Sequence, residues 1–330
     1  MGKRIGTRTV RLEHPPAVLG FAAVGGHMEG KGPLREQFDE ISEDHFWGQK
    51  TWEQGESTMQ KHALRKALEK ATLHEENIDY VFAGDLLNQC IGSSFSLRDS
   101  NIPFYGLYGA CSTMGESLSL AAMMIDGGFA ERTAALTSSH FCTAERQYRM
   151  PVPYGSQRTP TAQWTATAAG CCILGEEGDG PYVTHITAGK IVDMGIADPN
   201  NMGAAMAPAA HNTLSVLFRD TRTKPEDYDL IVTGDLGKLG HDIVVDLFAK
   251  EGVDMTKNYD DCGLLIFDRE EQDCTAAGAA AAAPPACCAA ICCAACGRRS
   301  GISSCSRPRA RCSHPRRRIR AKASRASATR

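Results

Sequence analysis

The sequence ENIDYVFAGDL at residues 76–86 returns as EDYDLIVTGDL at residues 226–236. The two stretches share Glu, Asp and the closing Gly-Asp-Leu at a constant offset of 150 positions, so we read them as two copies of one structural unit. In each copy a largely apolar run, Tyr80–Ala83 or Leu230–Thr233, predicts a strand that is covered on both faces. Strands of this kind belong to parallel or mixed sheets.

A helix is predicted before each of these strands. Residues 58–73 and 209–222 both keep apolar side chains at helical spacing, again at the same offset. We therefore expect an α/β protein of two similar βαβ halves, residues 1–180 and 181–273. The second half is expected to be incomplete, because it lacks its last elements.

Gly-Asp closes both copies and turns the chain at the end of the strand. Open α/β sheets place their ligands beyond the carboxyl ends of their strands, which makes Asp85 and Asp235 candidates for a binding site. The same two residues could equally cap the turn that follows, since Asp is common at helix starts and in turns. The sequence leaves both interpretations open.

Cys111 lies between a predicted strand, residues 102–108, and a predicted helix, residues 113–125. A helix N-terminus favours the thiolate form of a cysteine, and a tight Gly-Ala turn can push the sulfur into a cleft. Free cysteines are also among the most buried and inert residues, so an unreactive core position is the alternative.

The next predicted strand, residues 132–137, ends in Ser138-Ser139-His140 at the same edge of the sheet. Residues 143–149 then bring a Glu, a Tyr and two Arg, among them Arg146. Arg binds carboxylates in a bidentate manner and Tyr stacks on flat rings, so this segment could line a pocket for an anionic aromatic ligand. An Arg–Glu network that braces a dimer interface is the alternative.

Composition divides the chain at Asp273. Residues 274–330 carry 12 Lys or Arg and no acidic residue, which leaves 24 basic against 39 acidic residues, a net charge of −15, in residues 1–273. Such a body does not favour nucleic-acid binding. Its six cysteines lack metal-ligand spacing, which predicts no metal site and a reducing compartment. There is no apolar signal-peptide core and no apolar run of membrane-spanning length.

The segment after Asp273 is an alanine–cysteine run followed by an arginine–serine run. Cysteine pairs without CxxC spacing argue against a metal site, and a basic run without aromatics argues against a nucleic-acid arm. A reading frame one base earlier can encode Val-His-Gly-Gly-Gly-Ser-Gly-Cys-Gly-Cys-Ser-Ala followed by apolar residues, a sensible continuation of an α/β fold. We therefore expect residues 274–330 to be an out-of-frame, disordered tail; a natural disordered tail is the alternative.

Several motifs together resemble the stage V sporulation protein AD family over residues 10–273. They are Gly84-Asp85-Leu86-Leu87-Asn88-Gln89, Gly109-Ala110-Cys111-Ser112-Thr113, Ser138-Ser139-His140, Thr143-Ala144-Glu145-Arg146-Gln147, Gly203-Ala204-Ala205-Met206-Ala207-Pro208-Ala209-Ala210 and Asp261-Cys262-Gly263-Leu264. The resemblance implies a thiolase-like fold of two halves in a five-layer arrangement, with Cys111 at the nucleophile position. The shifted-frame glycine string is similar to the family's next segment.

The resemblance also implies a function in sporulation. Members are binding proteins, not enzymes, that face the cytoplasm as peripheral parts of a spore inner-membrane complex, and this complex moves dipicolinic acid into the developing spore. The expected partners are dipicolinic acid and the other subunits of that complex; a homodimer is compatible with this assignment, and no cofactor is expected. The predicted ligand-binding residues are Cys111, Ser139, His140, Arg146 and Asp85.

Two other functions remain open from the sequence. One is acyl transfer through a Cys111 thioester, as in thiolases and ketoacyl synthases, which supply an activating histidine from the C-terminal half. His185, His211 and His241 lack the sequence contexts of such a histidine. The other is a structural subunit with a vestigial pocket.

Overall fold

The computed structural model describes residues 3–148, 159–198, 200–274, 276, 278–279 and 318–323. The strands are β1 (Arg4–Ile5), β2 (Thr9–Arg11), β3 (Ala17–Gly25), β4 (Glu40–Ile41), β5 (Tyr80–Gly84), β6 (Phe104–Gly106), β7 (Arg132–Ser139), β8 (Trp164–Thr165), β9 (Ala168–Gly175), β10 (Tyr182–Ala188), β11 (Ile231–Thr233), β12 (Tyr259–Asp261), β13 (Gly278–Ala279) and β14 (Arg318–Ala323). The α-helices are α1 (Trp52–Ala71), α2 (Ile91–Leu97), α3 (Thr113–Asp126), α4 (Phe141–Tyr148), α5 (Met202–Thr221), α6 (Gly237–Lys250) and α7 (Cys262–Ile266).

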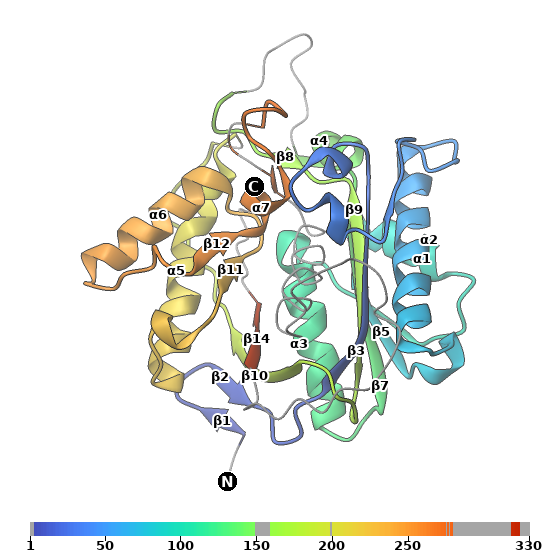
Figure 1. Cartoon of the computed structure of the whole chain (residues 1–330), viewed down its shortest axis with the longest axis horizontal. Coiled ribbons are helices and arrows are strands. Elements are labelled where there is room, and N and C mark those ends of the chain that lie inside the picture. The colour runs from blue at the N-terminus through green and yellow to red at the C-terminus, as the bar shows by residue number, and fades with distance from the viewer. Residues whose placement is uncertain are drawn as a thin grey trace.

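Helices and strands alternate in layers across the molecule (Figure 1). The outer helices α1 and α2 cover the sheet that contains β3, β5, β7 and β9, and α3 lies on the other side of that sheet. Beyond α3 come β10, β11 and β12, and then the outer helices α5 and α6. The mixed α/β fold class predicted from the sequence is confirmed.

The main sheet follows the order β1-β2-β10-β3-β9-β7-β5-β6, with β4 beside β3. β5 runs parallel to β6 and β7, whereas β9 is antiparallel to both β3 and β7. Because side chains alternate between the faces of a strand, Val81 and Ala83 contact the α1 layer while Phe82 contacts the α3 layer. The sheet is therefore covered on both faces, as its apolar strands predict.

The internal duplication is visible in the helices as well as in the strands. α1 and α5 each span 20 residues and begin and end at an offset of 150 positions. Each has a polar N-cap, Thr51 or Asn201, and each ends in a left-handed residue, Thr72 or Arg222. Both helices start one to two turns earlier than the sequence predicts, because the first turns are too polar or too rich in Gly and Pro to show an apolar face.

The second half has its own small core. α5 and α6 pack on the parallel pair β11 and β12, with Leu214, Phe218, Ile231 and Phe248 buried between them. Gly203 of α5 lies against the start of α6: a Cβ at this position would lie 2.4 Å from the carbonyl oxygen of Leu236. The absence of a side chain at Gly203 thus lets the two helices approach closely.

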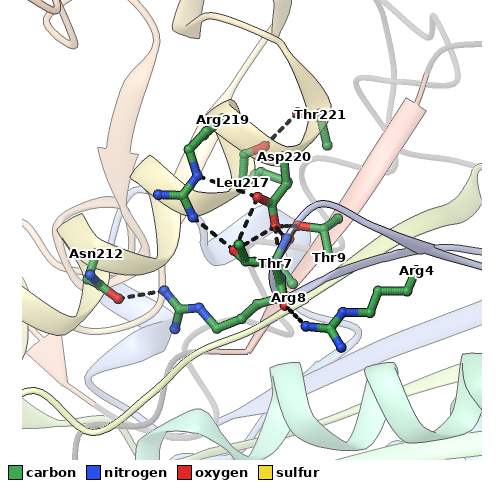
Figure 2. A network of polar contacts seen from close by, with 10 residues as sticks. Arg4, Thr7, Arg8, Thr9, Asn212, Leu217, Arg219, Asp220 and Thr221 are labelled. Atoms are coloured by element: carbon green, nitrogen blue, oxygen red, sulfur yellow. Dashed lines mark hydrogen bonds and ion pairs between the residues drawn. The ribbon is translucent and has the colours of Figure 1, made fainter.

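The N-terminal strands are tied to the second half by a network around Asp220 at the end of α5 (Figure 2). Its carboxylate accepts hydrogen bonds from the backbone N–H groups of Thr7 and Arg8, both at 2.9 Å, and from the hydroxyl of Thr9 at 3.1 Å. Burial raises the pKa of Asp220, but these hydrogen bonds lower it further, to about 2. The carboxylate therefore holds the edge of the sheet and α5 together as an ionised group.

The chain continues to pack against the body past Asp273. Cys274 and Ala276 are buried, and the backbone N–H of Lys238 donates to the carbonyl of Ala276 at 3.0 Å. β14 pairs in parallel with β10 on the side away from β2 and β3, where β10 offers an edge without another strand among the described residues. This differs from the expectation that packing stops at Asp273; the remainder of the segment lies outside the described residues.

None of the helices in the described part of the chain is long and apolar enough to cross a membrane.

Candidate functional site

Cys111 lies on a 3-10 turn, Ala110–Ser112, that leads directly into α3. The residue before it, Ala110, has φ of 47°, a left-handed conformation that is unusual for a residue with a side chain. The turn is held by the hydroxyls of Ser112 and Thr113, which donate to the carbonyls of Gly109 at 2.8 Å and Ala110 at 2.7 Å. A constrained turn of this kind places the half-buried sulfur at the start of the helix, as predicted.

A cavity of about 70 Å³ opens between Cys111 and the second half of the chain. Its walls come from the turn before α3, from one face of α5 and from the end of β11. The lining residues are Cys111, Ser112, Met206, Ala210, Thr213, Leu214, Val232, Thr233, Gly234, Asp235 and Leu236. The cavity thus joins Cys111 to the Gly-Asp-Leu of the second copy of the repeat.

Asp235 is the ionisable neighbour of Cys111 in this cavity. Its side chain is 6% exposed, and burial raises its pKa to about 6, while a hydrogen bond with the Cys111 side chain acts in the opposite direction. Its backbone carbonyl accepts a hydrogen bond of 2.7 Å from the side-chain amide of Gln163. The sequence pointed to Asp235 only as a strand-end residue; its position opposite Cys111 depends on how the two halves pack.

Asp85, the equivalent residue of the first copy, lies in a separate buried network. Its carboxylate accepts from the backbone N–H of Leu87 at 2.9 Å and from both the N–H and the hydroxyl of Ser93 at 2.7 Å. Burial raises the pKa of Asp85. The pKa of Glu56 is raised to about 8, mainly by burial and to a lesser extent by the nearby charge of Asp85. Asp85 holds the turn after β5 and does not line the cavity, so the structure favours the capping interpretation.

Ser139 and His140 are buried at the end of β7, and neither lines the cavity. The Ser139 hydroxyl donates to the carbonyl of Ala166 at 2.7 Å. His140 contacts the carbonyl of His45 through Nε2 at 2.8 Å and accepts from the N–H of Cys142 through Nδ1 at 3.2 Å. Burial lowers the pKa of His140, so a neutral imidazole with Nε2 protonated satisfies both contacts. Nδ1 thus caps the start of α4, and Nε2 ties it to the segment before α1.

Arg146 lies on the outside of α4. Its side chain is 54% exposed and forms an ion pair with Glu53 of α1. This pair resembles the bracing network that the sequence left open, here within one chain rather than across an interface. Of the predicted ligand-binding residues, the structure therefore brings only Cys111 to the cavity.

Neither a metal centre nor a histidine is found at this site. No group of three or more His, Cys, Asp or Glu side chains that could hold a metal ion occurs in the described portion of the chain. The cavity lining contains one thiol, hydroxyls, one carboxyl and apolar groups. The arrangement can hold a small polar group by hydrogen bonds.

Solved structures with the same arrangement of layers define the fold class. 3-Oxoacyl-[acyl-carrier-protein] synthase III from Aquifex aeolicus VF5 is 14% identical to this chain, with a TM-score of 0.55 over 84% of this chain and 90% of that one. Cerulenin-bound OleA from Xanthomonas campestris is 13% identical, with a TM-score of 0.56 over 87% of this chain and 90% of that one. The fold is therefore thiolase-like.

Sequence relatives then define the family within that class. The family model for stage V sporulation protein AD matches residues 6–299. Stage V sporulation protein AD of Bacillus subtilis (strain 168) is 42% identical over 270 residues, which cover 82% of this chain and 80% of that protein. The chain belongs to the stage V sporulation protein AD family and is a sporulation protein.

Proposed function

We propose that this protein binds dipicolinate at the cavity beside Cys111. In this role it acts as a peripheral, cytoplasm-facing component of the spore inner-membrane complex that moves dipicolinate into the developing spore. The observation that carries the proposal is the cavity itself, because it lies at the junction of the two halves and is lined by polar groups from both. Membership of a sporulation family supports the biological setting.

The cavity lining favours binding over acyl transfer. Cysteine nucleophiles are usually activated by a histidine within hydrogen-bond reach. The lining residues include no histidine, and His140 is engaged on both ring nitrogens by the backbone. The thiol of Cys111 is therefore assigned a contact role.

Size limits how the ligand can enter. Ligand sites generally measure about 300–1,000 Å³, whereas this cavity of about 70 Å³ admits a carboxyl group and a few waters without movement. A ring needs additional space, and the flexible side chain of Met206 is the wall best suited to provide it. One carboxylate of dipicolinate is thus placed in the cavity and the ring at its mouth.

A second, more open depression of about 420 Å³ lies at the start of α6 and is the alternative site. It carries Lys238, His241 and Arg269 around Tyr259, which would suit a flat anionic ring. However, Asp242 pairs with both Lys238 and His241, and Asp260 lines the same depression, so its positive charge is largely balanced. We therefore place the ligand at Cys111.

Calorimetric titration of dipicolinate into the full chain tests the proposal. We expect saturable binding that is weakened by Cys111→Ala and unchanged by Arg269→Ala. The reverse pattern would move the site to the second depression, and the absence of binding heat would overturn the proposal. A chain continued in the preceding frame after Asp273 is expected to bind more tightly, because it would carry the glycine-rich segment.

Mass spectrometry of the intact protein distinguishes acyl transfer from ligand binding. Incubation with an acyl-coenzyme A leaves a thioester adduct on Cys111 only if the protein acts as an acyl transferase. We expect the intact mass to stay unchanged.

A further inference from the structure

One buried oxygen of Asp235 has no hydrogen-bond partner among the residues that the structure describes. Oδ2 of this residue is shielded from solvent and accepts no hydrogen bond from the described part of the chain, and the side chain lines the cavity. Leaving a buried carboxyl oxygen unsatisfied costs about 1–3 kcal/mol, more if the group is charged. A ligand group at this point would remove that cost.

The duplicated architecture supplies an internal comparison. Asp85 occupies the equivalent position of the first copy, and both of its oxygens accept hydrogen bonds from Leu87 and Ser93. The same residue at the same strand end is thus satisfied in one half and unsatisfied in the other. The difference is that Asp235, and not Asp85, faces the cavity.

The hydrogen bonds of the neighbouring Asp261 indicate which of the two carboxyls, Asp261 or Asp235, is protonated. Its carboxylate accepts four hydrogen bonds of 2.7–3.0 Å, from the hydroxyl of Thr233 and from the backbone N–H groups of Leu236, Gly237 and Gly263. A proton on Asp261 would point at one of these donors. Burial raises the pKa of Asp261 to about 7 and that of Asp235 to about 6, so the two carboxyls titrate as a pair near neutral pH. Although the pKa of Asp261 is the higher of the two, a proton there would have to displace one of the four donors, whereas Oδ2 of Asp235 meets no donor from the described residues. The proton is therefore assigned to Asp235.

Few other charges face this pair. Cys111 approaches Asp235 from the turn before α3, and Tyr259 lies beside Asp261 on β12. Lys238, on the first turn of α6, is paired with Asp242 and points away into the second depression. From α5, the cavity receives only Met206, Ala210, Thr213 and Leu214, none of which titrates. No cation among the cavity-lining residues neutralises an incoming carboxylate.

We propose that Asp235 binds the ligand carboxylate as a neutral carboxylic acid, donating a hydrogen bond through Oδ2, so that ligand binding takes up one proton. The proton comes from solvent, and no covalent bond forms or breaks. This inference rests on the proposed function, since it names the group that makes a carboxylate tolerable in a cavity without a cation. Ionised Asp235 would repel the same ligand, so the carboxyl acts as a proton-dependent selector.

Two measurements on the full chain test it. The first is ligand-free infrared spectroscopy: at pH 5 the wild type should show carbonyl bands of buried carboxylic acids, Glu56 among them, and Asp235→Asn should lose the component that belongs to Asp235. Asp246→Asn is the matched control, because Asp246 lies on the neighbouring helix α6 and is exposed. The second is calorimetry of dipicolinate in two buffers of different ionisation enthalpy, which measures proton uptake without any variant.

The pH dependence of the Kd for dipicolinate provides a quantitative test. Between pH 6 and 8 dipicolinate keeps both carboxylates ionised. Over this range the wild-type Kd should rise by up to about tenfold per pH unit, as expected for one linked proton, and the uptake should approach one proton. Asp235→Asn can still donate a hydrogen bond through its amide, so its Kd should change less than about threefold.

The outcomes separate the two proposals. Binding without proton uptake, or equal pH dependence in wild type and Asp235→Asn, overturns the role of Asp235 and leaves dipicolinate binding intact. Absence of an acid band that Asp235→Asn removes also overturns it. If the band is present but dipicolinate gives no heat at any pH, Asp235 is confirmed as a neutral carboxylic acid. The proposals that the protein binds dipicolinate and that Asp235 selects for it are then overturned.

Discussion

Cys111 and Asp235 come from different halves of the chain and meet because the halves are packed face to face. The side chains touch through a thiol–carboxyl contact at the wall of a small cavity. A neutral contact of this type contributes roughly 1 kcal/mol. Cys111 therefore helps to hold the carboxyl in place.

Two single substitutions check this placement. Cys111→Ala should weaken dipicolinate binding about fivefold, as expected for the loss of a contact worth roughly 1 kcal/mol. Arg146→Ala should change the Kd less than about twofold, because Arg146 is exposed and its pair with Glu53 resembles other surface ion pairs. Titration of both variants side by side is the measurement; a large loss for Arg146→Ala would restore the pocket that the sequence favoured.

The sequence located Cys111 but not the rest of its surroundings. A strand, a tight turn and a helix are local features, so the position of Cys111 at a helix start followed from the pattern around it. His140 and Ser139 were chosen because parallel strands end at one edge, yet their side chains are used by the backbone of His45 and Ala166. Contacts of this kind depend on tertiary packing and leave no periodic signal.

At the level of elements, the repeat carried most of the predictable fold. The helices and strands of both copies were located because their apolar positions recur, whereas the first turns of α1 and α5 were missed because they show no apolar face. Pairing of β10 with β2 and β3 was also beyond reach, since strand partners distant in sequence have no local signature.

Because of the Asp220 network, the free energy of unfolding should decrease as the solution becomes acidic. The pKa of Asp220 is lowered to about 2 from an ordinary value of 3.8, so its contribution is complete above pH 4 and is lost as the pH falls towards 2. Asp220→Asn should reduce the free energy of unfolding at pH 7 by roughly 2–3 kcal/mol, because charge-assisted hydrogen bonds to Thr7 and Arg8 are weakened. Urea unfolding at pH 7 and pH 3 measures it.

Asp246→Asn serves as control for the change of charge alone. If both variants lost equal stability, or if the deficit of Asp220→Asn did not shrink in acid, the network would not be the cause.

The edge strand β6 is the element that favours self-association. In the described sheet it ends the strand order, and three aromatic side chains nearby are about half exposed, Phe95, Tyr105 and Tyr108. An unpaired edge bordered by exposed aromatic side chains is a surface that another copy can cover. We expect a homodimer in sedimentation experiments, and Tyr105→Arg should shift it to monomer. A wild-type monomer at high concentration would contradict this.

At the scale of the whole molecule, the basic composition after residue 279 predicts how the chain responds to a protease. We expect limited trypsin digestion to remove the basic segment faster than it cuts the body, because the composition there offers no apolar periodicity. Mass spectrometry of the products locates the cuts. Protection of Arg318 and Lys322 as strong as that of the body would show that β14 holds the segment in place. Sequencing the gene around codon 273 checks the reading frame directly.

The contact between the N-terminal strands and Asp220 of α5 determines when the N-terminus can fold during synthesis. Thr7, Arg8 and Thr9 find their partner Asp220 only after more than 200 further residues have been made. At about 5–20 residues per second this takes roughly 10–40 s, plus the time for the ribosomal tunnel to clear. During that interval the first strands remain without their final neighbours, since β2 pairs with β10 and closes against α5 only late. The amino terminus, although synthesised first, is thus among the last parts of this protein to reach its native contacts.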